Sequence, residues 1–85
     1  MSMGTLILSE ICLARRATME LIRDASPEAR ERLSASFVLE AIAAISASQL
    51  DINAACARLC QTGEEVMAQL ILDASAVTRV AEVNG

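Results

Sequence analysis

The hydrophobic and polar positions of this chain repeat with helical spacing over most of its length. From about Leu6 to Arg23, apolar residues recur at intervals of three and four, and charged residues gather largely on the opposite side. Runs that alternate between apolar and polar residues, as strands do, are nearly absent. The pattern therefore predicts an all-α chain that begins with an amphipathic helix.

The stretch from Leu33 to Leu50 is helical in composition but has no solvated side. Apolar residues fill both sides of its helical wheel, and Glu40 is its only charge. Such a helix must be covered nearly all round, and a chain of 85 residues has little else to cover it. We therefore expect part of this helix to contact a second chain. The expected interface residues are Leu33, Phe37, Ala41 and Ala44 on one side, and Val38, Ile42 and Ile45 on the other.

A clear helix boundary lies at the only proline. Ser26 is a residue type that caps the exposed amides of a helix, and Pro27 suits the first helical position. The sequence therefore predicts a second helix from Pro27 to about Leu50.

Two further helices are expected after this point. Asp51 is the predicted cap of a short helix from Ile52 to Cys60. Thr62 and Glu65 have the spacing of a capping box, which predicts a last helix from Gly63 to about Val83. One bent helix from Asp51 onward is the alternative. Apolar residues keep helical spacing through the last segment: Val66, Leu70, Ala74, Val77, Val80 and Ala81.

The composition limits the size of the core. Apolar residues make up 54% of the chain, but Phe37 is the only aromatic residue, and many of the rest are small alanines that favour close helix approach. A single domain over residues 1–85 is expected, and oligomerisation often supplements a core of this size. The predicted fold class is all-α: a helical hairpin or a small bundle of three to four helices, completed by oligomerisation.

The charge balance argues against a nucleic-acid partner. Eleven acidic residues face seven basic ones, which gives a net charge of −4. The turn Cys60–Gly63 between two helices has the look of a helix-turn-helix, but the following helix opens with Glu64 and Glu65, which phosphates would repel. We therefore expect no DNA or RNA partner.

Residues that support catalysis or metal binding are few. The chain has no histidine, which removes Ser-His and Cys-His nucleophile pairs. Cys56 and Cys60 lie four residues apart on one helix face, so two such pairs in a dimer would offer a zinc ion four thiolates. Cysteine is, however, among the most frequently buried residue types, so we interpret both as core residues. We expect no enzyme, no catalytic residues, no cofactor and no metal.

The cellular location follows from the N-terminal segment and the cysteines. Arg15 and Arg16 follow the first apolar run instead of preceding it, which argues against a secretory signal. Uninterrupted apolar runs are too short for a membrane span. Three cysteines fit free thiols in a reducing compartment. We expect a cytoplasmic protein with no membrane span.

Several motifs resemble those of the small alanine-rich subunits of R-bodies, the "killing trait" proteins that assemble into coiled bacterial ribbons. They cover about half of the chain: Asp24-Ala25-Ser26-Pro27, the small-residue run Ala41 to Gln49, and a stretch from Asn53-Ala54-Ala55 through Gln61-Thr62-Gly63 to Leu70 and Asp73-Ala74. The resemblance implies a structural polymer subunit without an active site.

Two functions are consistent with these features. The first is a small bacterial helical protein that acts by association with itself, as a dimer or larger assembly or a structural subunit. The alternative is a small acidic inhibitor or adaptor, encoded by a phage or a bacterium, that binds a larger protein through its central helix.

Overall fold

The computed structural model describes the backbone of residues 3–84 and the side chains of residues 6–77. Within this range the secondary structure consists of four helices, with no strand: α1 (Met3–Leu21), α2 (Pro27–Ala47), α3 (Ile52–Gln61) and α4 (Glu65–Asn84). The all-α prediction is confirmed. The segment after Asp51 forms two separate helices, so the alternative of one bent helix is wrong.

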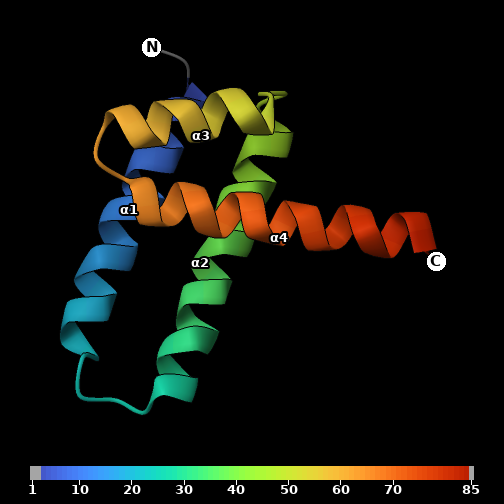
Figure 1. Cartoon of the computed structure of the whole chain (residues 1–85). Coiled ribbons are helices and arrows are strands. Elements are labelled where there is room, and N and C mark those ends of the chain that lie inside the picture. The colour runs from blue at the N-terminus through green and yellow to red at the C-terminus, as the bar shows by residue number, and fades with distance from the viewer. Residues whose placement is uncertain (1–2, 85) are drawn as a thin grey trace.

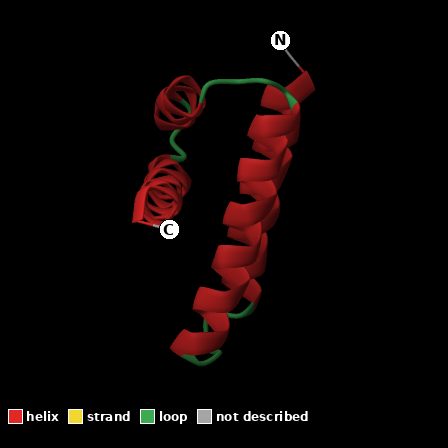
Figure 2. Cartoon of the chain, turned by 90° about the vertical axis from the view of Figure 1, so that its right-hand side faces the viewer, coloured by secondary structure: helices red, strands yellow, loops and turns green. Residues whose placement is uncertain are grey.

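The four helices form two layers. Helices α1 and α2 run side by side as an antiparallel hairpin (Figure 1), and α3 and α4 lie together on one side of that hairpin (Figure 2). Helix α4 crosses α2 and continues beyond it, so its C-terminal half projects from the rest of the molecule (Figure 1). The molecule measures 37 × 36 × 19 Å, and its smallest dimension corresponds to two helix diameters.

The local signals at the start and the end of α2 explain its length. Ser26 is the N-cap, and its side-chain oxygen accepts a hydrogen bond of 3.3 Å from the amide of Ala29. Pro27 occupies the first helical position, as predicted. The helix ends at Ala47, three residues before the predicted end, because Gln49 adopts a left-handed conformation with φ 58°. This turn brings Leu50 back against the core.

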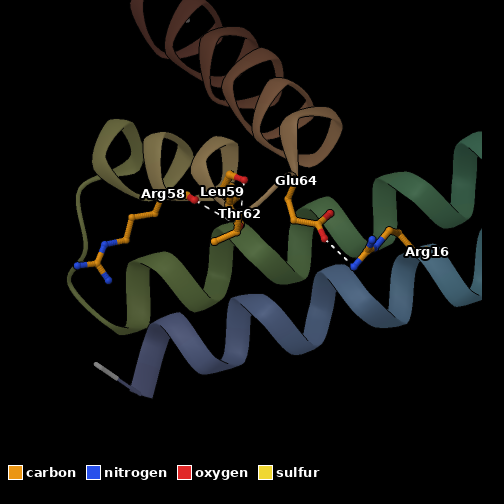
Figure 3. Close-up of polar contacts among 5 residues, drawn as sticks. All are labelled: Arg16, Arg58, Leu59, Thr62 and Glu64. Carbon is orange, nitrogen blue, oxygen red and sulfur yellow. Dashed lines mark hydrogen bonds and ion pairs between the residues drawn. The ribbon is translucent and has the colours of Figure 1, made fainter.

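The connection between α3 and α4 differs from the prediction. The Asp51 carboxylate accepts a hydrogen bond of 3.0 Å from the amide of Ala54 and caps α3, as expected. The predicted Thr62 capping box is wrong, because the Thr62 hydroxyl points back to α3 and donates to the carbonyl oxygens of Leu59 and Arg58 (Figure 3). Thr62 therefore closes the end of α3, and α4 begins at Glu65.

A Schellman motif completes this end of α3. The Glu64 amide donates to the Leu59 carbonyl at 2.8 Å, and the Gly63 amide donates to the Cys60 carbonyl at 3.2 Å. Gly63 has φ 86°, in the left-handed region that side chains with a Cβ disfavour. The chain reverses here because glycine tolerates this conformation.

We expect Gly63→Ala to lower the free energy of unfolding by about 1–2 kcal/mol. An added Cβ would meet no atom within 4 Å, so the loss would come from the backbone alone. Urea unfolding followed by circular dichroism measures it. Gly63→Asn is the matched control, since asparagine tolerates left-handed φ, and it should lose less. Equal stability of Gly63→Ala and the unmodified chain would contradict this account.

The core lies between the two layers and draws on all four helices. Small residues in it, such as Ala41, Ala55 and Ala68, let the helix backbones approach closely. Ser75 is also buried, and its hydroxyl has no hydrogen-bond partner within the described part of the chain. The buried apolar residues are Leu8, Cys12, Val38, Ala41, Ile45, Ala55, Cys56, Leu59, Met67, Ala68 and Ile71.

Candidate functional site

Three of the seven predicted interface residues lie in the core of the chain itself. Val38, Ala41 and Ile45 are buried, because the α3–α4 layer covers this side of α2. Most of their surface is therefore taken up inside the chain, and of the three only Val38 also lines the open groove described below. The sequence pattern identified them as apolar but could not show what covers them.

The other four predicted residues keep exposed surface to different degrees. Phe37 and Ile42 are partly buried and pack against the edge of the core, and Ala44 is also partly buried. Leu33 is exposed. The structure thus divides the predicted interface between the core of the chain and its surface.

Large apolar side chains are exposed on three of the four helices. Leu13 and Leu21 on α1 are 58% and 86% exposed, and Leu39 on α2 is 66% exposed. Val77 on the projecting helix α4 is 69% exposed. The complete set among the described side chains is Leu6, Ile7, Leu13, Leu21, Leu33, Leu39, Val66 and Val77.

A groove lies in the angle between α2 and α4. It has a volume of about 350 Å³, and we call it the α2–α4 groove. Most of its lining is apolar, and Glu31 is the only charged residue in it. The residues that line it are Glu31, Ser34, Ala35, Val38 and Leu39 from α2, and Leu70 and Ala74 from α4.

The sequence predicted neither this groove nor its use of Leu39. Ala35 and Leu39 lie four residues apart on one face of α2, and Leu70, Ala74 and Val77 share a face of α4. Helical spacing in the sequence is enough to identify each of these two stripes. It cannot show that they meet in one groove, because that depends on where α4 crosses α2.

The three thiols have different surroundings. Burial raises the pKa of Cys12 to about 11; the Glu64 carboxylate also raises it, and Arg15 and Arg16 oppose the shift. Burial also raises the pKa of Cys56, with a further contribution from Cys60, and the Cys56 thiol donates to the Ala68 carbonyl at 3.6 Å. Cys12 and Cys56 therefore remain protonated near neutral pH and are poor nucleophiles.

The described side chains do not gather into a metal site. Cys56 is buried in the core, as interpreted from the sequence, but Cys60 is exposed, so its interpretation as a core residue is wrong. The two thiols therefore lie in different environments. No group of three or more Cys, Asp or Glu residues in the described range is placed to hold a metal ion.

Two polar contacts join the helices beside the core. Arg16 Nη2 on α1 forms an ion pair of 3.0 Å with Oε1 of Glu64, the residue before α4 (Figure 3). Arg15 Nε donates to Ser34 Oγ at 3.1 Å and links α1 to α2. Since the Arg16 side chain is largely exposed, the ion pair contributes at most about 1 kcal/mol to stability.

The length and hydropathy of the helices show which of them could span a membrane. Taken one at a time, the helices of the described range lack the length and apolar character of a membrane span. Helices α2 and α3 together meet these criteria by length and composition, but with a bend of 120° between them.

No protein-family model, curated protein or solved structure matches this chain. The resemblance to R-body subunits thus stays a prediction from the motifs described above.

Proposed function

We propose that this protein is a structural subunit that acts by associating with copies of itself and catalyses no reaction. The observation that carries the proposal is the exposed area. The chain exposes 5922 Å², whereas a monomeric protein of 9.0 kDa exposes about 4,850 Å². The excess is about 1,100 Å² per chain, and large apolar side chains such as Leu21, Leu39 and Val77 are part of the exposed surface.

The shape and chemistry of this surface support the same proposal. The radius of gyration is 13.2 Å, against about 12 Å for a compact domain of this length. Exposed leucine and valine side chains contribute to the excess, and water contact with such side chains is unfavourable. The resemblance to R-body subunits also favours a structural role.

The non-enzymatic part of the proposal rests on the available side chains. The sequence contains no histidine, and two of its three thiols are buried with raised pKa values. A reducing cytoplasm suits three free cysteines, so we propose the cytoplasm as the location. The net charge of −4 supports partners other than nucleic acid.

We expect the purified chain to form a dimer or a larger species at micromolar and higher concentrations. Sedimentation velocity and multi-angle light scattering across a concentration series measure the mass directly. Association should persist in moderate salt, because apolar burial is not screened as surface charge pairs are. A mass of 9.0 kDa at every concentration would contradict the proposal.

Burial within α2 weighs against the alternative of an adaptor that inserts this helix into a larger protein. Helix-in-groove binding needs an apolar face free to enter the partner. Val38, Ala41 and Ile45 on α2 are already covered, so insertion would require the α3–α4 layer to detach. Self-association through exposed surface needs no such rearrangement.

A further inference from the structure

A second pocket lies between α1 and α2, close to the turn of the hairpin, and we call it the hairpin pocket. It has a volume of about 280 Å³. Unlike the α2–α4 groove, it contains two arginines, although acidic residues outnumber basic ones by eleven to seven in this chain. Positive charge is therefore concentrated at this point of the hairpin. The residues that line the pocket are Arg15 and Met19 from α1, and Pro27, Arg30, Glu31 and Ser34 from α2.

The fold holds the guanidinium group of Arg15 in place but uses only part of its hydrogen-bonding capacity. Arg15 is half-buried, and its Nε donates a hydrogen bond of 3.1 Å to Ser34 Oγ on the neighbouring helix. A guanidinium group carries five N–H donors, so those on the two Nη atoms remain. Within the described part of the chain, neither Arg15 nor Arg30 forms an ion pair, although Glu31 lines the same pocket. An anion that enters the pocket therefore meets donors that no carboxylate of the chain occupies.

The charges of the lining favour a monovalent anion. Two guanidinium groups and the Glu31 carboxylate give the pocket a net charge of about +1 near neutral pH. Guanidinium groups bind both carboxylate and phosphate oxygens, often through paired hydrogen bonds. A single carboxylate neutralises the net charge, whereas a phosphate dianion would leave an excess negative charge beside Glu31. Charge complementarity therefore selects a carboxylate.

The remaining lining and the size of the pocket restrict the ligand further. Met19 and Pro27 add apolar surface to the pocket. Its volume lies just below the range of about 300–1,000 Å³ that is typical of small-molecule sites. A small organic acid with an apolar group fits both properties.

We infer that the hairpin pocket binds a small organic acid that carries one carboxylate and an apolar group. The carboxylate lies between the guanidinium groups of Arg15 and Arg30, and the apolar group lies against Met19. Ser34 acts as a positioning residue, because its hydroxyl fixes the Arg15 side chain. The site binds without making or breaking a covalent bond. It goes beyond the proposed self-association and does not depend on it.

Benzoate is the probe for this site, because it combines one carboxylate with a compact apolar ring. We expect it to bind with a Kd of about 1 mM or tighter in a low-salt buffer free of other carboxylates. Benzamide has nearly the same shape without the charge and should bind at least about tenfold more weakly. Inorganic phosphate should also bind more weakly than benzoate. Titrations followed by nuclear magnetic resonance measure the affinity, and signals of residues 15–19 and 27–34 should shift most.

Three charge-neutralising variants of α2 and α1 locate the binding. Arg30→Gln removes a guanidinium group from the pocket and should raise the benzoate Kd about tenfold. Arg32→Gln is the matched control, because this exposed residue lies on the same helix outside the pocket lining, and it should leave the Kd nearly unchanged. Glu31→Gln removes the competing carboxylate and should lower the Kd. All three residues are exposed, so the fold should be retained, which circular dichroism checks.

Each contrary result overturns the inference in a recognisable way. Absence of binding at about 20 mM benzoate, well above the expected Kd, shows that the pocket holds no such acid. Equal losses in Arg30→Gln and Arg32→Gln show that benzoate responds only to overall charge. Benzamide binding as tight as that of benzoate excludes the guanidinium groups as its partners, and tighter phosphate binding excludes a carboxylate site. Self-association is measured separately by sedimentation velocity, so the proposed function stands or fails independently of these results.

Discussion

Ile45→Glu is expected to abolish the helical fold. The Ile45 side chain is 1% exposed and lies in the core between the two layers, among residues that offer no cation to a carboxylate. An unpaired buried charge costs several kcal/mol, which is a large part of the 5–15 kcal/mol that stabilises a typical domain. We expect loss of most of the helical circular dichroism signal at neutral pH.

Acid should partly restore the fold of this variant. Burial raises the pKa of the new carboxyl group in the folded state, so protonation favours the folded chain and the destabilisation should shrink as the pH falls. Leu39→Glu provides the control on the same helix, because its side chain is exposed and its helix content should be kept. Full helicity of Ile45→Glu at neutral pH would show that α2 does not pack as described.

Ile71→Ala is expected to lower the free energy of unfolding by about 2–5 kcal/mol. Ile71 is fully buried and is among the largest of the fully buried side chains. It belongs to the core cluster that draws on all four helices, so its truncation leaves a cavity in the core. Urea or thermal unfolding measures the loss.

Two variants on α4 control for this effect. Ile71→Val removes a single methylene group and should cost about 0.5–1.5 kcal/mol. Val77→Ala removes apolar atoms from a side chain that is 69% exposed, and at concentrations where the chain is monomeric it should change the stability little. If Ile71→Ala is no more destabilising than Val77→Ala, α4 is not anchored through Ile71.

Both main predictions depend on burial, which the sequence pattern did not supply. The wheel of α2 showed apolar residues on both sides and led to an interface that included Ile45. In the folded chain burial does not follow these two sides: Val38 and Ile45 from one side and Ala41 from the other are buried. Leu39, one position beyond Val38, is exposed. The composition of α2 suggests more apolar surface than one chain can cover. Helix α1, its partner in the hairpin, and helix α4, which crosses it, nevertheless cover part of that surface.

The sequence by itself determined the helices and most of their boundaries. Ser26, Pro27 and Asp51 act within one helical turn, so their effects depend on residues three positions away and are readable from spacing. Thr62 was the exception, because a threonine between two helices can bond to either one. It closes α3, where the left-handed Gly63 completes the turn.

Only the tertiary structure decided which apolar faces are covered and where the groove lies. Helical spacing places Leu39 on one stripe and Leu70 and Ala74 on another, but it carries no information on the crossing of α2 and α4. That crossing follows from small residues such as Ala41 and Ala68, which let the two layers approach, and from the turn at Gly63, which sets the direction of α4. Helix boundaries depend on local preferences along the chain and could be predicted from the sequence. Burial depends on contacts between distant segments, so only the tertiary structure shows it.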